Sequence, residues 1–278
     1  MRNLFTKLIA AVGLLALAST ASAQAPAPSA AYTGPRFPGG PDSLRALVQR
    51  SIRTATGSPA PSGRMLVQFE LKANGQPHNY TMVLPPAPLN KPLVNATAAA
   101  LNYLEAHMPA WTPGTPDPKL APGAEPKVSL AIDFTTAPAA MPYYYADEDP
   151  TFGTLANLLQ AQGSKSSNQP VADPAEKALL ASPKGLARYI QRQVKYPPAA
   201  LRGQQQGVVY AYFEVAESGA IEHPEILGSA GRTLDAEVLK SLNTLPTATS
   251  PAKLKNQPAH VYYVVPVTFR MQVATRFR

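Results

Sequence analysis

The stretch RMLVQFELKANG, residues 64–75, decides the fold, because a second version of it, VVYAYFEVAESG, recurs at residues 208–219. In both versions apolar residues occupy alternate positions and include β-branched and aromatic side chains. This alternation predicts a half-buried β-strand. Each version ends in a turn signal, Asn74-Gly75 or Ser218-Gly219. Each strand is therefore expected to return as a hairpin, at about residues 76–84 and 220–227.

A helix is expected ahead of each of these strands. Pro41 and Pro183 hold equivalent positions, and proline suits the first turn of a helix because its missing N–H would be unpaired there. Apolar residues then recur every four positions, which places them on one helical face. They are Leu44, Val48 and Ile52 in the first half of the chain, and Leu186, Ile190 and Val194 in the second.

A second helix and a last strand follow in both halves. The helix is indicated by the apolar sets Leu93, Leu101, Leu104 and Met108, and Leu234, Val238, Leu242 and Leu245, with Pro109 and Pro246 ending them. The strand is indicated by the alternating sets Val128, Leu130, Ile132 and Phe134, and Tyr263, Val265, Val267 and Phe269.

Both halves thus follow the order helix, strand, strand, helix, strand. We predict an α+β fold of two small modules, each with a three-stranded antiparallel sheet. The expected boundaries are a signal peptide at 1–23, a disordered Ala/Pro segment at 24–36, a first module at 37–136, a linker with short helices at 137–181 and a second module at 182–278.

The N-terminus has the features of a secretory signal peptide. Arg2 and Lys7 precede the apolar run Leu8–Ala18, and Ala21-Ser22-Ala23 is a small-residue cleavage site. The run is shorter than the roughly 20 residues that a membrane-spanning helix needs. We expect a periplasmic protein, with an uncleaved membrane anchor as the alternative. The formal net charge of +8 favours acidic partners or anionic surfaces, and export argues against nucleic acid.

Short motifs add a family resemblance. The second module contains Tyr196-Pro197, the Gly-led strand 207–215, Leu234-Asp235-Ala236-Glu237 and Pro266-Val267-Thr268-Phe269. The first module contains Phe37-Pro38-Gly39-Gly40 and a Trp loop at 108–114. In order and spacing these motifs resemble the TonB C-terminal domain family. The second module departs from the pattern at 247–251, where the Trp loop is missing, and the first module lacks the Tyr-Pro and Leu-Asp-x-Glu motifs.

The resemblance implies a periplasmic protein-interaction module. In TonB this domain binds an extended segment of an outer-membrane receptor as an added strand, because an edge strand offers unpaired N–H and C=O groups. The partner-binding residues expected on this basis are Val261, Tyr262, Tyr263, Val264, Val265, Pro266, Val267 and Thr268. Alternatively, this strand is covered by residues 271–278, by a second copy of the module or by homodimerisation.

No catalytic, cofactor-binding or metal-binding motif stands out. His78, His107, His223 and His260 are scattered without metal-ligand spacing, and there is no cysteine. The Gly228–Gly231 loop lacks the spacing of a hydrolase nucleophile turn, and no phosphate-binding glycine motif is present. We therefore expect no enzyme activity, no cofactor and no small-molecule substrate. The run Tyr143–Tyr145 is interpreted as a surface stretch or an aromatic contact.

Two further functions stay open at this point. The first is a membrane-anchored TonB-type energy transducer. Its spacer would be too short, because residues 24–36 reach only about 40 Å at ~3.1 Å per residue. The second is a structural protein that contacts an anionic cell wall through the basic residues 184–202.

Overall fold

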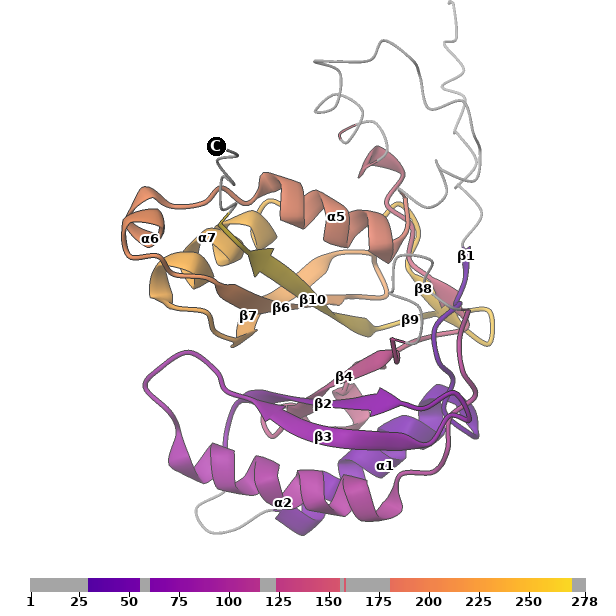
Figure 1. The fold of residues 1–278 in the computed structure, drawn as a ribbon. Coiled ribbons are helices and arrows are strands. Elements are labelled where there is room, and N and C mark those ends of the chain that lie inside the picture. Colours follow the sequence, from indigo (N-terminus) through magenta and orange to yellow (C-terminus); the bar gives the residue numbers. More distant parts are fainter. Residues whose placement is uncertain (1–29, 56–60, 116–123, 156–157, 159–180, 272–278) are drawn as a thin grey trace, which may run out of the picture.

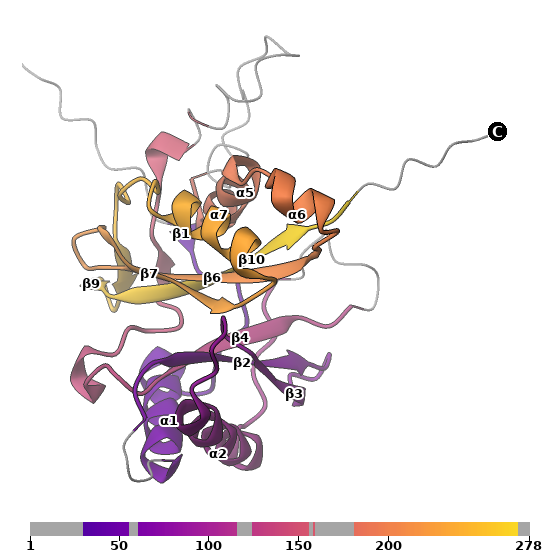
Figure 2. The same cartoon turned by 90° about the vertical axis from the view of Figure 1, so that its left-hand side faces the viewer.

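The computed structural model describes residues 30–55, 61–115, 124–155, 158 and 181–271. They form four layers, with helices on both outer sides and two sheets packed face to face between them (Figures 1 and 2). No helix within these ranges is long and apolar enough to cross a membrane. The predicted signal peptide, residues 1–23, lies outside them.

The first module has the predicted order of elements. They are α1 (Gly40–Ala55), β2 (Arg64–Leu71), β3 (Pro77–Val83), α2 (Lys91–His107) and β4 (Lys127–Asp133). The sheet is antiparallel, with strand order β3-β2-β4. Leu44 and Val48 of α1 and Leu104 of α2 pack on Val67 and Phe69 of β2, so the helices cover one face of the sheet.

The second module repeats this plan. Its elements are α5 (Pro183–Gln193), α6 (Pro198–Arg202), β6 (Gly207–Val215), β7 (Ile221–Gly228), α7 (Arg232–Leu242) and β10 (Val261–Phe269). The strand order β10-β6-β7 is that of the first module read from the other edge. Leu186, Ile190, Leu234 and Val238 pack on the helix-facing side of this sheet. The expected α+β fold in small modules, each with a three-stranded antiparallel sheet, is confirmed.

The two hairpins share the same irregularity. The register shifts between Gln68 and Glu70 in the first module and between Tyr212 and Glu214 in the second. Asn79 and His223 have φ values of 54° and 50°. The Asn79 side chain donates to Glu70 at 2.8 Å, and the His223 ring lies 3.0 Å from Glu214. A bulge of this kind re-aims a side chain, and here it does so in the same way in both modules.

The hairpin turns are also docked alike. Gly75 and Gly219 have φ values of 80° and 85°, which favour glycine. The N–H of Trp111 donates to the Gly75 carbonyl, and the N–H of Ala248 donates to the Gly219 carbonyl, both at 2.9 Å. A Cβ on Gly75 would lie 1.8 Å from the Trp111 carbonyl oxygen. In the second module Ala248 therefore occupies the place that Trp111 takes in the first.

A small additional sheet was not predicted. It contains β1 (Ala30–Ala31), β5 (Glu148–Asp149), β8 (Ala252–Leu254) and β9 (Gln257–Ala259), in the order β1-β5-β8-β9. The expectation of disorder for residues 24–36 is wrong for the part described. Ala30–Ala31 pair with β5, and the ring of Tyr32 stacks on Tyr145 with centroids 4.6 Å apart.

The segment between the modules packs into both of them. Met141 and Tyr145 are buried with the core of the first module, and Phe152 and Leu155 with that of the second. Residues 138–140 form a single 3₁₀ turn. Of the linker expected to contain short helices, residues 159–180 lie outside the described residues.

The central strands β2 and β6 are buried on both faces along much of their length, not half-buried as the alternation predicted. In β2 the consecutive residues 65–69 are all buried. The face turned away from the helices meets the other sheet, through a layer formed by Leu66, Ala131, Tyr212, Leu227 and Tyr262. We call this the inter-module layer. Stacking of the second sheet removes water from the face that an isolated module would expose.

Candidate functional site

The predicted binding residues lie in β10, at an edge of the second sheet. β10 pairs with β6 alone among the named strands, and its register runs unbroken from Val261 to Phe269. Val261, Val265, Val267 and Phe269 face the helices and are buried there. Tyr262 and Val264 face the inter-module layer. The edge position that strand addition requires is therefore present.

Each end of the outer edge of β10 is already paired. Tyr143 donates its N–H to the His260 carbonyl at 2.8 Å and accepts from the Tyr262 N–H at 3.0 Å. At the other end the Gln191 amide donates to the Thr268 carbonyl at 3.1 Å and accepts from the Thr268 N–H at 2.9 Å. The chain itself therefore covers both ends of the strand, through Tyr143 of the connecting segment and Gln191 of α5.

The middle of the edge has no such partner. Backbone groups of alternate residues point to the same side of a strand, so Val264 and Pro266 face outward together with Tyr262 and Thr268. Among the residues that the structure describes, none hydrogen-bonds to the Val264 N–H or to the carbonyls of Tyr262, Val264 and Pro266. Proline has no N–H to offer. The available edge thus presents one donor and three acceptors.

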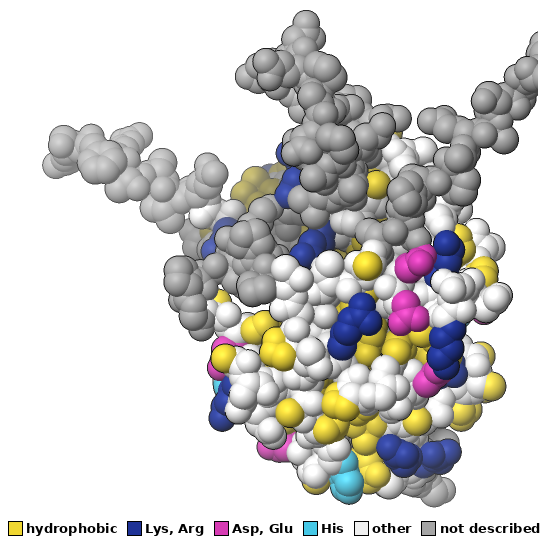
Figure 3. Space-filling model, turned by 90° about the vertical axis from the view of Figure 1, so that its right-hand side faces the viewer, with side chains coloured by type: hydrophobic (Ala, Val, Ile, Leu, Met, Phe, Trp, Pro, Cys, Tyr) yellow, Lys and Arg dark blue, Asp and Glu magenta, His cyan; other side chains and the backbone are white. Residues whose placement is uncertain are grey.

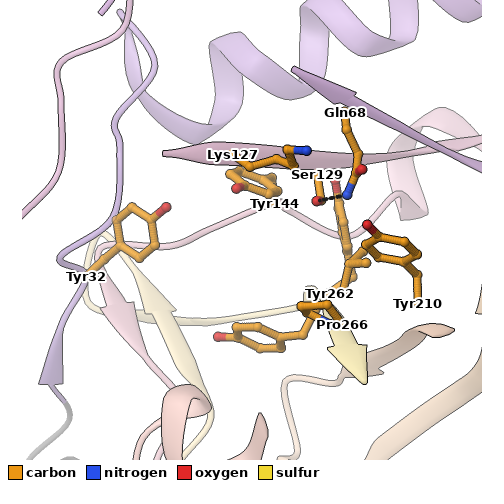
Figure 4. A pocket seen from close by; sticks show the side chains of 10 residues that line it. Tyr32, Gln68, Lys127, Ser129, Tyr144, Tyr210, Tyr262 and Pro266 are labelled. Atoms are coloured by element: carbon orange, nitrogen blue, oxygen red, sulfur yellow. Dashed lines mark hydrogen bonds between the residues drawn. The ribbon is translucent and has the colours of Figure 1, made fainter. Parts of the chain in front are cut away.

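A pocket of about 310 Å³ opens beside this middle stretch. It lies between β10 and the strands β2 and β4 of the first module (Figure 4). Tyrosine rings form much of its wall, and Gln68 donates to the Ser129 hydroxyl on its far side at 2.8 Å. The lining residues are Tyr32, Gln68, Lys127, Ser129, Tyr144, Tyr210, Tyr262, Tyr263, Val264 and Pro266.

The corresponding edge of the first module is sealed by tyrosines. The N–H of Ala131 in β4 donates to the Tyr262 hydroxyl at 3.2 Å. The backbone of Ser129 hydrogen-bonds to the Tyr144 hydroxyl. Burial raises the pKa of Tyr144 to about 12, so its phenol stays neutral at physiological pH. Ala131 and Ser129 therefore cannot accept an added strand without displacing these rings, and the two final strands differ in the backbone groups that their outer edges leave unpaired among the described residues.

A buried ionic cluster joins the two sheets. Arg64 lies 2.7 Å from Asp133 of its own module, and 3.1 Å and 3.4 Å from Glu214 and Glu225 of the other. Its guanidinium also lies 5.0 Å from the centre of the Tyr212 ring. An arginine with several donors can satisfy several carboxylates at once. Arg64 therefore links the sheet of the first module to that of the second.

Glu214 is the most enclosed member of this cluster. Its Oε2 lies 3.0 Å from His223 and 2.8 Å from His260, and Tyr212 donates to its Oε1 at 2.7 Å. Burial alone would raise the pKa of Glu214, but its contacts with His260, Tyr212 and His223 and the charge of Arg64 lower it to about 2. His223 and His260 lie far apart in the sequence. That both contact Glu214 was not predicted.

One group of possible metal ligands exists among the residues described. The ligand atoms of Glu70, His78 and Glu125 lie within 4.8 Å of one another. His78 pairs with Glu125, and Glu70 is engaged by Asn79 at 2.8 Å and by Lys127 at 3.4 Å. These contacts account for the grouping without an ion.

Residues 192–271 match the family model described as Gram-negative bacterial TonB protein C-terminal. The match begins at the end of α5 and includes β6, β7, α7 and β10, but it covers less than half of the chain. It indicates a TonB-like envelope protein-interaction module, a type of domain that is not enzymatic. No curated protein and no solved structure matches the chain.

Proposed function

We propose that this chain is a periplasmic protein that binds an extended segment of another envelope protein, with that segment added as a strand along β10. The observation that carries the proposal is the unpaired stretch from the Tyr262 carbonyl to the Pro266 carbonyl, on a regular edge strand inside the family match. Segments of outer-membrane receptors are the first partners to consider. The proposed partner residues are those predicted from the sequence, Val261–Thr268.

The length of the available edge limits the affinity. One donor and three acceptors allow four hydrogen bonds, each with a net value of about 1 kcal/mol. The sum, about 4 kcal/mol, corresponds to a dissociation constant near ~1 mM before any loss of rotational and translational freedom. Backbone pairing alone would therefore be weak. A dissociation constant well below this value requires further contacts. These are side-chain contacts, or extra backbone bonds made after the Tyr143 and Gln191 pairings are released.

We further infer that the first module is a divergent second copy of the same domain. The shared bulge at Asn79 and His223 and the equivalent docking of Trp111 and Ala248 support this view. The Tyr262 and Tyr144 hydroxyls on β4 suit a copy that serves as a scaffold. In the proposal, only the second module keeps the outer edge of its last strand available to a partner.

The test is a titration of the whole chain, followed by NMR, with peptides from the N-terminal segments of receptors of the same organism. Val264→Pro removes the one outward donor of the middle stretch without removing a bond to β6. Met82→Pro is the matched control, because it removes an outward N–H from the edge strand β3 of the other sheet. We expect saturable shifts around Tyr262–Pro266 that are lost in the first variant and kept in the second. Equal binding by both variants would exclude pairing at β10.

A further inference from the structure

The direction of the side chains gives the pocket beside β10 a role in binding. In an antiparallel pair, residues directly opposite each other point their side chains to the same face of the sheet. Val264 points into the inter-module layer and lines the pocket. The residue of a bound segment opposite Val264, here called the central residue, must therefore point toward the first module and into the pocket.

Resting on the proposed function, we propose that the first module and the connecting segment form a specificity pocket that selects a segment whose central residue is aromatic and carries a hydrogen-bond donor. Tyr144, Tyr210 and Tyr262 supply ring surfaces from the connecting segment and from two strands of the second module. Aromatic rings pack on one another in offset and edge-to-face arrangements. The pocket volume of about 310 Å³ is sufficient for a tryptophan or tyrosine side chain.

The polar groups in the pocket specify the donor. Gln68 is 5 % exposed, and its amide N–H₂ donates to the Ser129 hydroxyl. Its carbonyl oxygen has no hydrogen-bond partner among the described residues. A phenol O–H or an indole N–H reaching this end of the pocket would satisfy that acceptor, whereas a phenylalanine or leucine side chain would leave it unpaired.

The backbone of β10 excludes proline at three positions of the segment. The central residue must donate to the Val264 carbonyl, and the residues two positions before and after it must donate to the carbonyls of Pro266 and Tyr262. Only the central residue is required to accept a bond, from the Val264 N–H. The tyrosine-lined pocket is therefore not suited to a polyproline segment if that segment is to pair with β10.

Charge favours an acidic neighbour. Among the lining residues that the structure describes, Lys127 is the only one that carries a charge. Its side chain is 50 % exposed and its ion pair with Glu70, at 3.4 Å, lies at the surface, where such pairs are weak. An aspartate or glutamate close to the aromatic residue would meet this ammonium group. The preferred partner is thus an extended, acidic segment with tyrosine or tryptophan at its centre.

The experiment is a selection of displayed random peptides on the whole chain, with four variants analysed in parallel. Peptides that bind the unmodified chain but not Val264→Pro are strand-adding ligands. Among them, we expect enrichment of tyrosine and tryptophan next to an acidic residue. Gln68→Leu should weaken the selected peptides roughly tenfold while leaving alanine-substituted versions unaffected. Lys127→Ser should weaken them at low salt only, and Lys72→Ser, at an exposed position outside the pocket lining, should not.

The outcomes separate the two proposals. If no selected peptide is sensitive to Val264→Pro, strand addition at β10 fails and the pocket inference fails with it. If sensitive peptides are recovered without aromatic enrichment, or if Gln68→Leu affects aromatic and alanine versions equally, strand addition stands and the specificity pocket is refuted. Circular dichroism of each variant ensures that a loss of binding reflects the site and not unfolding.

Discussion

Replacing Arg64 by methionine tests whether the ionic cluster holds the two sheets together. Arg64 is 13 % exposed and contacts Asp133 and Glu214, which are 4 % and 2 % exposed. The variant keeps most of the side-chain volume but leaves both carboxylates without their cation. Removing one partner of a buried ion pair costs about 3–5 kcal/mol. We expect a loss of about 3 kcal/mol, because Glu214 keeps its contacts with Tyr212 and the two histidines and because Arg64 is not fully enclosed.

The assay is urea unfolding of the chain at neutral pH, monitored by circular dichroism. Arg50→Met is the control, since Arg50 lies exposed on the same module. A change of about 3 kcal/mol is a large part of the 5–15 kcal/mol by which native domains are stable. If Arg64→Met unfolds within about 0.5 kcal/mol of Arg50→Met, the cluster does not hold the modules together and the reasoning is wrong.

The same variant makes a prediction about pH. The pKa of Glu214 is about 2, below the usual 4.5, so its ionisation contributes stability that is present above pH 4.5 and is lost as the pH falls toward 2. A difference of this size corresponds to about 3 kcal/mol at neutral pH. Without Arg64 the folded-state pKa should rise, so the gap between variant and wild type should narrow as acid is added. A gap that stays constant or widens would contradict this account.

Three further changes have defined outcomes. Gly75→Ala should lower stability by at least about 2 kcal/mol, seen as a lower thermal midpoint, because its Cβ would lie 1.8 Å from the Trp111 carbonyl at a positive φ. Tyr262→Phe should cost about 1–2 kcal/mol in the same measurement, since it leaves a buried N–H of β4 without an acceptor. Gln191→Ala should release the two Thr268 bonds and tighten peptide binding in an NMR titration, and weaker binding would refute the view that Gln191 blocks the edge.

The strands and helices of both modules were predictable because their signals are local. Alternation marked residues 64–71, and a four-residue spacing marked the helix that begins near Pro41. Comparing the two halves of the chain strengthened the prediction, because the same strand and turn pattern occurs in both. The β8–β9 hairpin was not predicted. It has no counterpart in the first module, and its strands are only three residues long.

The surroundings of the candidate site could not be predicted in this way. Edge position was implied by the order of elements, but the pairing of Tyr143 with His260 and of Gln191 with Thr268 joins residues more than 70 positions apart. Burial of both strand faces depends on a partner sheet that lies elsewhere in the chain. One signal was present in the sequence. Leu66 and Tyr212 are large side chains at positions that a solvent-facing strand surface would fill with polar residues.

The stacking of the two sheets explains how two similar modules came to differ in what they can bind. The layer that hides one face of each sheet also brings Tyr262, a residue of the proposed binding strand β10, onto the outer edge of β4. The contact closes the first module's edge and at the same time forms a wall of the pocket beside the second module's edge. An isolated second module would keep the edge groups of β10 but would lose Gln68, Lys127 and Ser129. We therefore expect it to pair with extended segments less selectively than the whole chain does, and the comparison of the two in the peptide selection would measure what the first module adds.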